Sequence, residues 1–226
     1  YPLRRQRQMC IRDRSSSSRR WRNRMIVAVE GIDGAGKHTL VAAVKERFGA
    51  ETLAFPRYDE SVHAQLASDA LHGRMGDLAD SAFGMATLFA LDRHGAKQLL
   101  DGFAGATDKI IVLDRYVASN AAYTRARTGD PAAMRWVHDL EFGKLQLPQP
   151  DLQVLVDTPP DVARDRAAAR EERDASRTRD RYERDEALQV ATFEAYAELA
   201  EANWASRWIR ASDPAVIMQA MSELVH

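Results

Sequence analysis

One segment constrains the fold of this chain more than any other, the stretch from Met25 to Phe48. It begins with the continuous apolar run MIVAVE, passes through the glycine-rich loop GIDGAGK, and continues with apolar residues at helical spacing. A short apolar run of this kind is typical of a strand that is buried on both faces of a parallel sheet. A strand, a glycine-rich loop that ends in lysine and a helix, in that order, predict a phosphate-binding loop.

The predicted loop can bind phosphate for three physical reasons. Its glycines allow successive backbone N–H groups to point at one anion, the N-terminus of the following helix adds partial positive charge, and Lys37 can reach the β- and γ-phosphates. The alternative is a glycine-rich turn with an incidental lysine, and the spacing and context favour the phosphate loop. The next residue is usually serine or threonine, whose hydroxyl helps to hold Mg²⁺, but here it is His38. The loop therefore predicts phosphate binding and leaves the Mg²⁺ ligands open.

The rest of the chain alternates between strand and helix patterns, which predicts one α/β domain over residues 25–226. Such alternation is typical of an open parallel sheet with helices on both faces. Further strands are expected over residues 52–56, 109–114, 151–157 and 207–210. Helices are expected over residues 61–72, 81–104, 119–127, 132–143, 185–203 and 214–225, with another that begins at Pro160. The expected buried positions of the two longest helices are Phe83, Ala86, Ala90, Ala96 and Leu100, and then Leu188, Thr192, Ala195, Tyr196 and Leu199.

The composition excludes several classes of protein. The chain has 226 residues, of which 45% are hydrophobic and 29% are charged, and these are the proportions of a globular protein. No run approaches the 18 apolar residues that a membrane-spanning helix needs, so we expect no membrane partner. Cys10 is the only cysteine, which excludes a disulfide framework and a cysteine zinc site and predicts a reducing, cytoplasmic location.

The charge is unevenly distributed along the chain. Residues 1–24 hold nine arginines and one aspartate, a net charge of +8, so the rest of the chain carries −9 of a total of −1. This basic segment shows no apolar periodicity, and we expect a disordered tail. We favour a non-native extension translated from upstream of Met25. A basic nucleic-acid-binding arm and an arginine- and serine-rich transit peptide are the alternatives.

Four more fragments extend the pattern of the phosphate loop: LAFPRY at 53–58, TLFALDRHGA at 87–96, LDRYVASNAAY at 113–123 and DRYERD at 180–185. Together with GIDGAGK, and in this order, they resemble the bacterial thymidylate kinases, particularly those of mycobacteria and corynebacteria. The resemblance implies a P-loop kinase fold with a five-stranded parallel sheet and a helical lid, a homodimer, and transfer of the γ-phosphate of ATP to dTMP with Mg²⁺, a step in dTTP synthesis. It assigns ATP binding to Gly31, Ile32, Asp33, Gly34, Ala35, Gly36, Lys37, His38 and Thr39.

The resemblance also implies which side chains surround the reacting phosphates. Arg115 follows Asp114 at the C-terminal end of a predicted buried strand, where open α/β sheets bind ligands. The arginine of this motif holds the acceptor phosphate in the family, and a simple strand-end ion pair is the alternative. Asp33 and Lys37 join Arg115 among the implied catalytic residues. The implied Mg²⁺ ligands are Asp33, Asp114 and Glu183.

The resemblance places the thymine base against Phe55, with Arg93 and Asn120 at its hydrogen-bonding edge. An aromatic ring offers a flat apolar face, and a guanidinium and an amide can bond the carbonyl and imide groups. On spacing alone, Phe55 is better explained as core and Arg93 as a surface charge, and the matching fragments reverse that. Pro56 is expected to fix the backbone of Phe55, with a cis bond as one way to do so, and Tyr58 lies in the same fragment. The remaining substrate residues, near the sugar and the acceptor phosphate, are Asp33, Arg115, Tyr123, Tyr182 and Glu183.

A basic segment over residues 164–184 is the predicted lid. The spacing of Arg166, Arg170, Arg173 and Arg177 places four guanidiniums on one face of a helix. Guanidinium groups donate well to phosphate oxygens, and the family closes such a lid over ATP. Arg170, Arg173 and Arg177 are therefore expected to approach the transferring phosphoryl group, and a solvated charged helix is the alternative.

Other functions fit the sequence less well. A kinase for another nucleoside monophosphate would share the loop and the lid but would lack the set of Phe55, Arg93 and Asn120. A GTPase would need an NKxD motif after a strand, and the sequence has none. A non-enzymatic nucleic-acid-binding protein would depend on residues 1–24 alone, so we expect no specific nucleic-acid partner.

Overall fold

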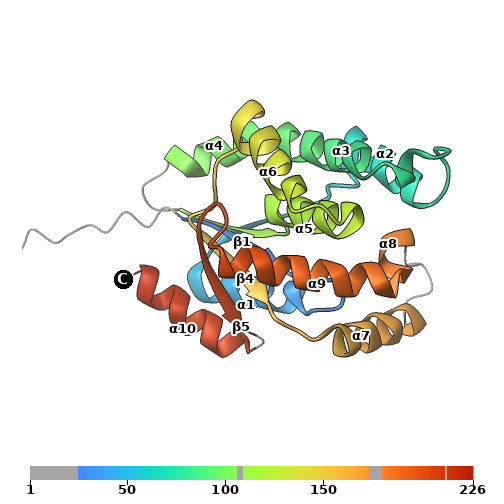
Figure 1. The fold of residues 1–226 in the computed structure, drawn as a ribbon. Coiled ribbons are helices and arrows are strands. Elements are labelled where there is room, and N and C mark those ends of the chain that lie inside the picture. Colours follow the sequence, from blue (N-terminus) through green and yellow to red (C-terminus); the bar gives the residue numbers. More distant parts are fainter. Residues whose placement is uncertain (1–24, 106–108, 174–179, 212, 226) are drawn as a thin grey trace, which may run out of the picture.

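Five parallel strands form a single sheet at the centre of the molecule (Figure 1). The computed structural model describes residues 25–105, 109–173, 180–211 and 213–225. The strands are β1 (Met25–Glu30), β2 (Glu51–Ala54), β3 (Ile110–Asp114), β4 (Leu152–Val156) and β5 (Arg207–Ala211). Their order in the sheet is β2-β3-β1-β4-β5. β1, β3 and β4 are almost wholly buried, which explains why their sequences are apolar at successive positions.

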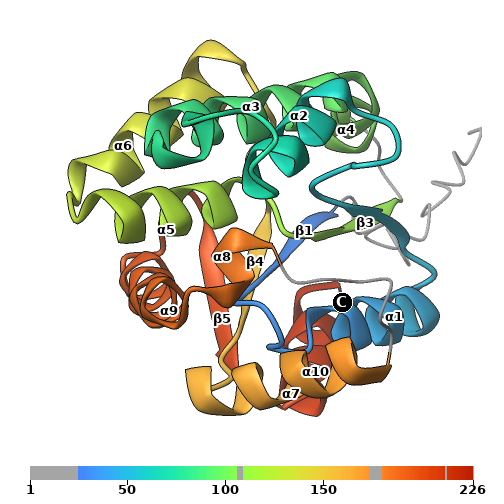
Figure 2. The same cartoon turned by 90° about the vertical axis from the view of Figure 1, so that its right-hand side faces the viewer.

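Helices connect the strands and cover both sides of the sheet. In chain order they are α1 (Lys37–Phe48), α2 (Val62–Leu71), the 3₁₀-helix η1 (Leu78–Asp80), α3 (Ala82–Gly95), α4 (Lys97–Gly105), α5 (Val117–Thr128), α6 (Ala132–His138), the π-helix η2 (Asp139–Lys144), α7 (Pro160–Arg173), α8 (Arg181–Arg184), α9 (Glu186–Glu201) and α10 (Pro214–Val225). α1 and α10 lie on one side of the sheet and α3 to α6 on the other, with α9 packed along α5 (Figures 1 and 2). The predicted α/β class and the alternating layout are confirmed, whereas the tail predicted over residues 1–24 lies outside the described residues.

Three predicted elements have different bounds in the structure. The single helix expected over 81–104 is wrong, because Ala96 separates α3 from α4 by donating its N–H to the carbonyl of Arg93, three residues back, which tightens the last turn. The strand expected over 52–56 ends at Ala54, because proline at position 56 cannot donate to the sheet. The helix expected over 132–143 changes at Asp139 from α6 to the wider η2.

One predicted buried position is also wrong. Phe83 is 41% exposed at the start of α3, and its ring meets the edge of Trp136 with centroids 4.7 Å apart. The other four positions of that prediction are buried, and so are all five in α9. Helical periodicity predicts a core position for Phe83, but the neighbour that covers one side of it is Trp136 of α6, a second aromatic side chain at the surface.

The register of the strands brings three strand ends to one edge of the sheet. Asp114, the last residue of β3, pairs with Val29 of β1 and with Ala54 of β2. The backbone N–H of Arg115 donates to the Val29 carbonyl (2.9 Å), and that of Phe55 donates to the Asp114 carbonyl (2.9 Å). The loops that follow these strands therefore begin side by side.

Candidate active site

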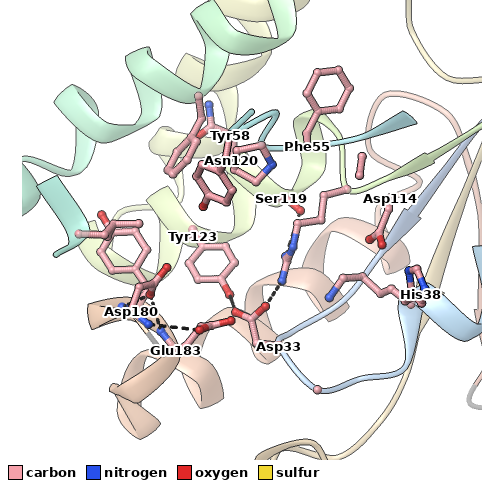
Figure 3. Close-up of a pocket in the computed structure, with 18 of the residues that line it drawn as sticks. Asp33, His38, Phe55, Tyr58, Asp114, Ser119, Asn120, Tyr123, Asp180 and Glu183 are labelled. Carbon is pink, nitrogen blue, oxygen red and sulfur yellow. Dashed lines mark hydrogen bonds and ion pairs between the residues drawn. The ribbon is translucent and has the colours of Figure 1, made fainter. Parts of the chain in front are cut away.

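A cavity of about 590 Å³ opens at this edge of the sheet (Figure 3). Phosphate-loop residues lie at one end of it, and an aromatic ring, an amide and a guanidinium lie at the other. Of the sequence-predicted residues, those that line it are Asp33, Gly34, Gly36, Lys37, His38, Thr39, Phe55, Pro56, Tyr58, Arg93, Asp114, Arg115, Asn120, Tyr123, Tyr182 and Glu183. The other loop residues, Gly31, Ile32 and Ala35, are buried behind this lining.

The phosphate loop takes a backbone course that its glycines permit. Gly34 has φ of +80° and Gly36 has φ of +103°, in the region that residues with a side chain rarely adopt. A Cβ atom on Gly34 would also overlap the backbone oxygen of Ala163 in α7. The loop ends where α1 begins, at Lys37, so the positive end of this helix lies at the cavity.

The ammonium group of Lys37 is held inside the loop. Its Nζ donates to the carbonyls of Gly31 (2.9 Å) and Ile32 (2.8 Å). Burial, and then the charge of Arg115, lower the pKa of Lys37 to about 8, although Asp33 favours the charged form. A polyphosphate would supply negative charge at the place where the loop concentrates positive charge.

Arg115, Asp33 and Tyr123 form a polar cluster beside the loop (Figure 3). The guanidinium of Arg115 forms an ion pair with the Oδ1 atom of Asp33, and the hydroxyl of Tyr123 donates to Oδ2 (2.7 Å). Burial alone would raise the pKa of Asp33, but the charges of Arg115 and Lys37 hold it well below its usual range. Arg115 has φ of +66°, an unusual conformation for a residue with a side chain. The predicted neighbours at the acceptor phosphate are therefore together in space.

A buried network behind Arg115 was missed by sequence reasoning. Arg115 Nη1 lies 3.3 Å from the hydroxyl of Ser119 and 3.5 Å from that of Tyr196. Both hydroxyls donate to one oxygen of Glu30 (2.6 and 3.1 Å), and the N–H of Tyr116 donates to the other (2.8 Å). Burial raises the pKa of Glu30, against the hydrogen bond from Ser119. Glu30 was visible as the carboxylate that closes β1, and Tyr196 as one member of an apolar stripe, but neither pattern indicated the contact.

The loop after β2 presents Phe55 to the cavity. Phe55 is 4% exposed, packs on Tyr116 with ring centroids 6.0 Å apart, and still lines the cavity. The Phe55–Pro56 peptide bond is cis. The next residue anchors the loop, because the Nε atom and the backbone N–H of Arg57 each donate to the buried carboxylate of Asp92 (both 3.0 Å). A rigid aromatic face therefore lies at the end of the cavity away from the phosphate loop.

Arg93 and Asn120, the predicted base-reading pair, lie at the same end as Phe55. They come from α3 and α5, and both donate to the carboxylate of Glu141 in η2. Burial works against the charged form of Arg93, but the charge of Glu141 keeps its pKa raised. No sequence signal indicated Glu141, which is fully buried.

Tyr182 closes the cavity on the side of α8. Its ring lies nearly parallel to that of Tyr123, with centroids 5.9 Å apart, and the guanidinium of Arg127 lies 4.9 Å from the Tyr182 ring centre. Gln189 joins this side to the phosphate loop, because its Nε2 donates to the Tyr182 carbonyl (2.9 Å) and its Oε1 accepts from the N–H of Asp33 (3.3 Å). Tyr182 and Tyr123 are predicted site residues, whereas no pattern in the sequence indicates Arg127 or Gln189.

The predicted lid is only partly within the described residues. α7 contains Arg166, whose Nη1 lies 3.4 Å from the carbonyl of Ala35 in the phosphate loop. Thr158, just before α7, donates to the same carbonyl (2.9 Å). The described residues do not include Arg177, or the side chains of the α7 residues Arg170 and Arg173.

Divalent-metal ligands are not gathered into a cage in the described part of the chain, where no three histidine, cysteine, aspartate or glutamate side chains lie together. Both oxygens of Asp33 already accept hydrogen bonds. Asp114 lines the cavity at the end of β3, and Glu183 lines it from α8, where its Oε2 accepts from the N–H of Asp180 (3.2 Å). Mg²⁺ commonly takes one or two carboxylates together with substrate phosphates and water, so this donor set fits the ion without a preformed cage.

A parallel sheet of this order, with a phosphate loop after its central strand and a cavity that extends from this loop to Phe55, Arg93 and Asn120, defines a P-loop kinase. Comparisons with known proteins specify the family. The family model for thymidylate kinase matches residues 29–220, and the chain belongs to the thymidylate kinase family.

Individual relatives agree with this assignment. A thymidylate kinase of Mycobacterium tuberculosis is 50% identical over 193 residues, which cover 82% of this chain and 90% of that protein. A thymidylate kinase of Akkermansia muciniphila is 32% identical over 157 residues, which cover 68% and 71%. The solved structure of thymidylate kinase from Candida albicans aligns with a TM-score of 0.62 at 17% identity, over 89% of this chain and 90% of that one, and so supports the fold. Among the described helices, none combines the length and the apolar character needed to cross a membrane.

Proposed function

We propose that this protein transfers the γ-phosphate of ATP to dTMP, giving ADP and dTDP. The observation that carries the proposal is a single cavity with a phosphate loop at one end and the set of Phe55, Arg93 and Asn120 at the other. A nucleoside monophosphate that lies against Phe55 would extend its phosphate toward Arg115 and the loop. Family membership supports the same substrates.

Catalysis in this proposal depends on position and charge rather than on covalent chemistry. Phosphoryl transfer needs the donor and acceptor oxygens in line and the charge around the moving group neutralised. Lys37 binds the donor phosphates and Arg115 binds the acceptor phosphate. Arg170, Arg173 and Arg177 of the lid segment are proposed to complete the neutralisation when the lid closes.

Mg²⁺ belongs to the same proposal. The ion would be held by phosphate oxygens, water and the carboxylates of Asp114, Asp33 and Glu183, and it would neutralise charge on the donor phosphates. His38 is exposed at the mouth of the loop, and its imidazole suits softer metals better than Mg²⁺. We therefore propose no ligand role for His38.

Two further parts of the proposal concern the protein as a whole. The resemblance implies a homodimer, and we place its contact surface at Phe83 and Trp136, two exposed aromatic side chains that touch each other. A cytoplasmic location is supported by the cysteine content, because a chain with one cysteine cannot form an internal disulfide of the kind found in oxidising compartments.

Measurement of ADP release tests the reaction directly. The wild-type chain should release ADP with dTMP as acceptor, more slowly with dUMP, and hardly at all with dCMP, dAMP or dGMP. Chelation of Mg²⁺ by EDTA should stop the reaction, and added Mg²⁺ should restore it. Lys37→Ala should abolish ADP release while the circular dichroism spectrum is unchanged. A preference for any other acceptor would replace dTMP in the proposal.

A further inference from the structure

One buried carboxylate holds both polar residues at the base end of the cavity. The Oε2 atom of Glu141 accepts from Arg93 Nε (2.5 Å), and Oε1 accepts from Arg93 Nη2 (2.8 Å) and from Asn120 Nδ2 (2.7 Å). Glu141 and its two partners come from η2, α3 and α5, so a single side chain joins three elements. η2 is a π-helix, a form that occurs mostly as short insertions and often at functional sites.

The contacts of Asn120 determine which way its amide group faces. Its Nδ2 donates to the carbonyl of Ala86 (2.9 Å) as well as to Glu141. A carbonyl and a carboxylate can only accept, so the amide nitrogen and not the amide oxygen must face them. Both N–H bonds of the amide are then used, and no described residue donates to Oδ1. Asn120 lines the cavity, to which it offers a hydrogen-bond acceptor.

The contacts of Arg93 leave a hydrogen-bond donor to face the cavity. Nε and Nη2 are bonded to Glu141, whereas Nη1 has no hydrogen-bond partner among the described residues. Arg93 is 3% exposed and lines the cavity. A guanidinium can only donate, so Arg93 offers a donor beside the acceptor of Asn120.

We propose that Glu141 is a specificity-determining residue, because it fixes this pattern of a donor beside an acceptor. The proposal rests on the proposed function and deepens it. The edge of thymine presents a keto oxygen that accepts at O4 and an imide that donates at N3, which match Arg93 and Asn120. Cytosine presents the reverse, an amino group at C4 and an acceptor at N3. If Asn120 were free to turn its amide, the contact with N3 would no longer discriminate between the two bases, and only Arg93 would still reject the amino group at C4.

The sharpest test compares dTMP with 5-methyl-dCMP, which has the same size, methyl group, sugar and phosphate and differs only at this edge. In Glu141→Gln, one acceptor oxygen becomes an NH₂ group that donates, so only the Ala86 carbonyl still holds the wild-type orientation of the Asn120 amide. An amide that turns its oxygen toward the new NH₂ group presents its nitrogen to the cavity. The ratio of kcat/KM for dTMP to that for 5-methyl-dCMP should fall by about tenfold or more, since a site that pairs with a polar group strongly rejects the wrong partner. The KM for ATP should stay within about twofold of wild type, because the change is far from the phosphate loop.

Glu30→Gln is the matched control. It also neutralises a fully buried carboxylate, but Glu30 lies behind Arg115 at the phosphate end. Because dTMP and 5-methyl-dCMP carry the same phosphate, Glu30→Gln should lower kcat/KM for both substrates and leave the ratio of the two values unchanged. Glu141→Asp keeps two oxygens that only accept, and it should keep the ratio within about threefold of wild type even where total activity falls.

Each outcome decides the inference. An unchanged ratio in folded Glu141→Gln overturns it, and so does a fall of the same size in Glu30→Gln. If Glu141→Gln does not fold, the ratio in Glu141→Asp decides, and a lost preference for dTMP there overturns the inference. A wild-type chain that phosphorylates 5-methyl-dCMP as efficiently as it phosphorylates dTMP overturns the role of Glu141 but leaves the proposed function standing. A wild-type chain without activity on dTMP overturns the proposed function, and this inference with it.

Discussion

Neighbouring groups act in opposite directions on the pKa of Lys37. Burial and the nearby Arg115 lower its pKa to about 8, while Asp33 and Asp114 favour the charged form. A lowered pKa means that the charged form is lost as the pH rises through that value. Only the ammonium form carries a positive charge and a third N–H donor beside those bonded to Gly31 and Ile32. Under the proposed function, we therefore expect Lys37 to set the pH dependence of ATP binding.

We expect kcat/KM for ATP to fall as the pH rises above about 8, approaching a tenfold loss per pH unit, because this parameter reports groups of the free enzyme. The kcat at saturating ATP should persist to higher pH, since bound phosphates favour the charged form of Lys37. Initial rates between about pH 7 and pH 10, with ADP quantified directly, provide the measurement. A flat kcat/KM up to about pH 9.5 would contradict this account of Lys37.

Tyr196 supports Arg115 from behind through its hydroxyl group. Tyr196→Phe removes one donor to the buried Glu30 and one neighbour of the Arg115 guanidinium. The free energy of unfolding should fall by about 1–3 kcal/mol, the usual cost of a buried polar group that loses a partner. KM for dTMP should rise more than KM for ATP, because we propose that Arg115 binds the acceptor phosphate.

The control for Tyr196→Phe is Tyr116→Phe. The Tyr116 hydroxyl is also in the core and donates to the Pro148 carbonyl (3.0 Å), away from Arg115. Urea denaturation should give a similar loss of stability for both variants, whereas only Tyr196→Phe should change the KM for dTMP. If Tyr196→Phe changed the KM for dTMP and the KM for ATP by the same factor, Tyr196 would act on stability alone.

At the scale of elements, the contact between α7 and the phosphate loop joins the predicted lid to the donor site. Gly34 lies against the backbone of Ala163, and Thr158 and Arg166 both approach the carbonyl of Ala35. The loop therefore depends on α7 for its shape, and a side chain at Gly34 would force the two apart.

Gly34→Ala tests this dependence. The positive φ of Gly34 alone should cost about 1–2 kcal/mol for a residue with a Cβ atom, and the overlap with Ala163 must also be relieved. We expect the KM for ATP to rise by about tenfold or more, with a lower midpoint of urea unfolding. Gly102→Ala in α4 is the control, because a Cβ there meets open space and alanine favours a helix by about 1 kcal/mol. Normal ATP kinetics in Gly34→Ala would show that the loop does not need this contact.

At the scale of the whole molecule, the exposed aromatic pair of Phe83 and Trp136 bears on assembly. The pair joins α3 to α6 on the outside of the helical layer, which Figure 1 shows above the sheet. The double variant Phe83→Ser and Trp136→Ser should convert a dimer to a monomer in size-exclusion chromatography with light scattering. Val190→Ser, at a 44% exposed position on α9, should remain a dimer. A wild-type monomer at micromolar concentration would contradict the proposed homodimer.

Several features of this protein follow from its sequence alone, because each depends on residues that are close together in the chain. The phosphate loop is an example, since the buried strand, the glycines and Lys37 all lie within residues 25–37. The alternation of strands and helices predicts the parallel sheet for the same reason, and Arg115 follows from its place at a strand end. The base-site residues are implied by a resemblance of short fragments, and the structure brings all three to one cavity.

Tertiary structure alone decided the contacts that hold these residues in place. Glu141 lies 48 positions from Arg93, and Tyr196 lies 166 positions from Glu30, so no local pattern links either pair. The exposure of Phe83 depends in the same way on Trp136, which comes from another helix. The spacing of apolar residues and the conformation of glycine depend only on residues that are close in the chain. A buried polar group, in contrast, finds its hydrogen-bond partner on whichever element packs against it. The sequence by itself therefore determined most of the elements and the strand–loop–helix segment around Lys37, and packing decided which buried carboxylates orient the side chains of the site.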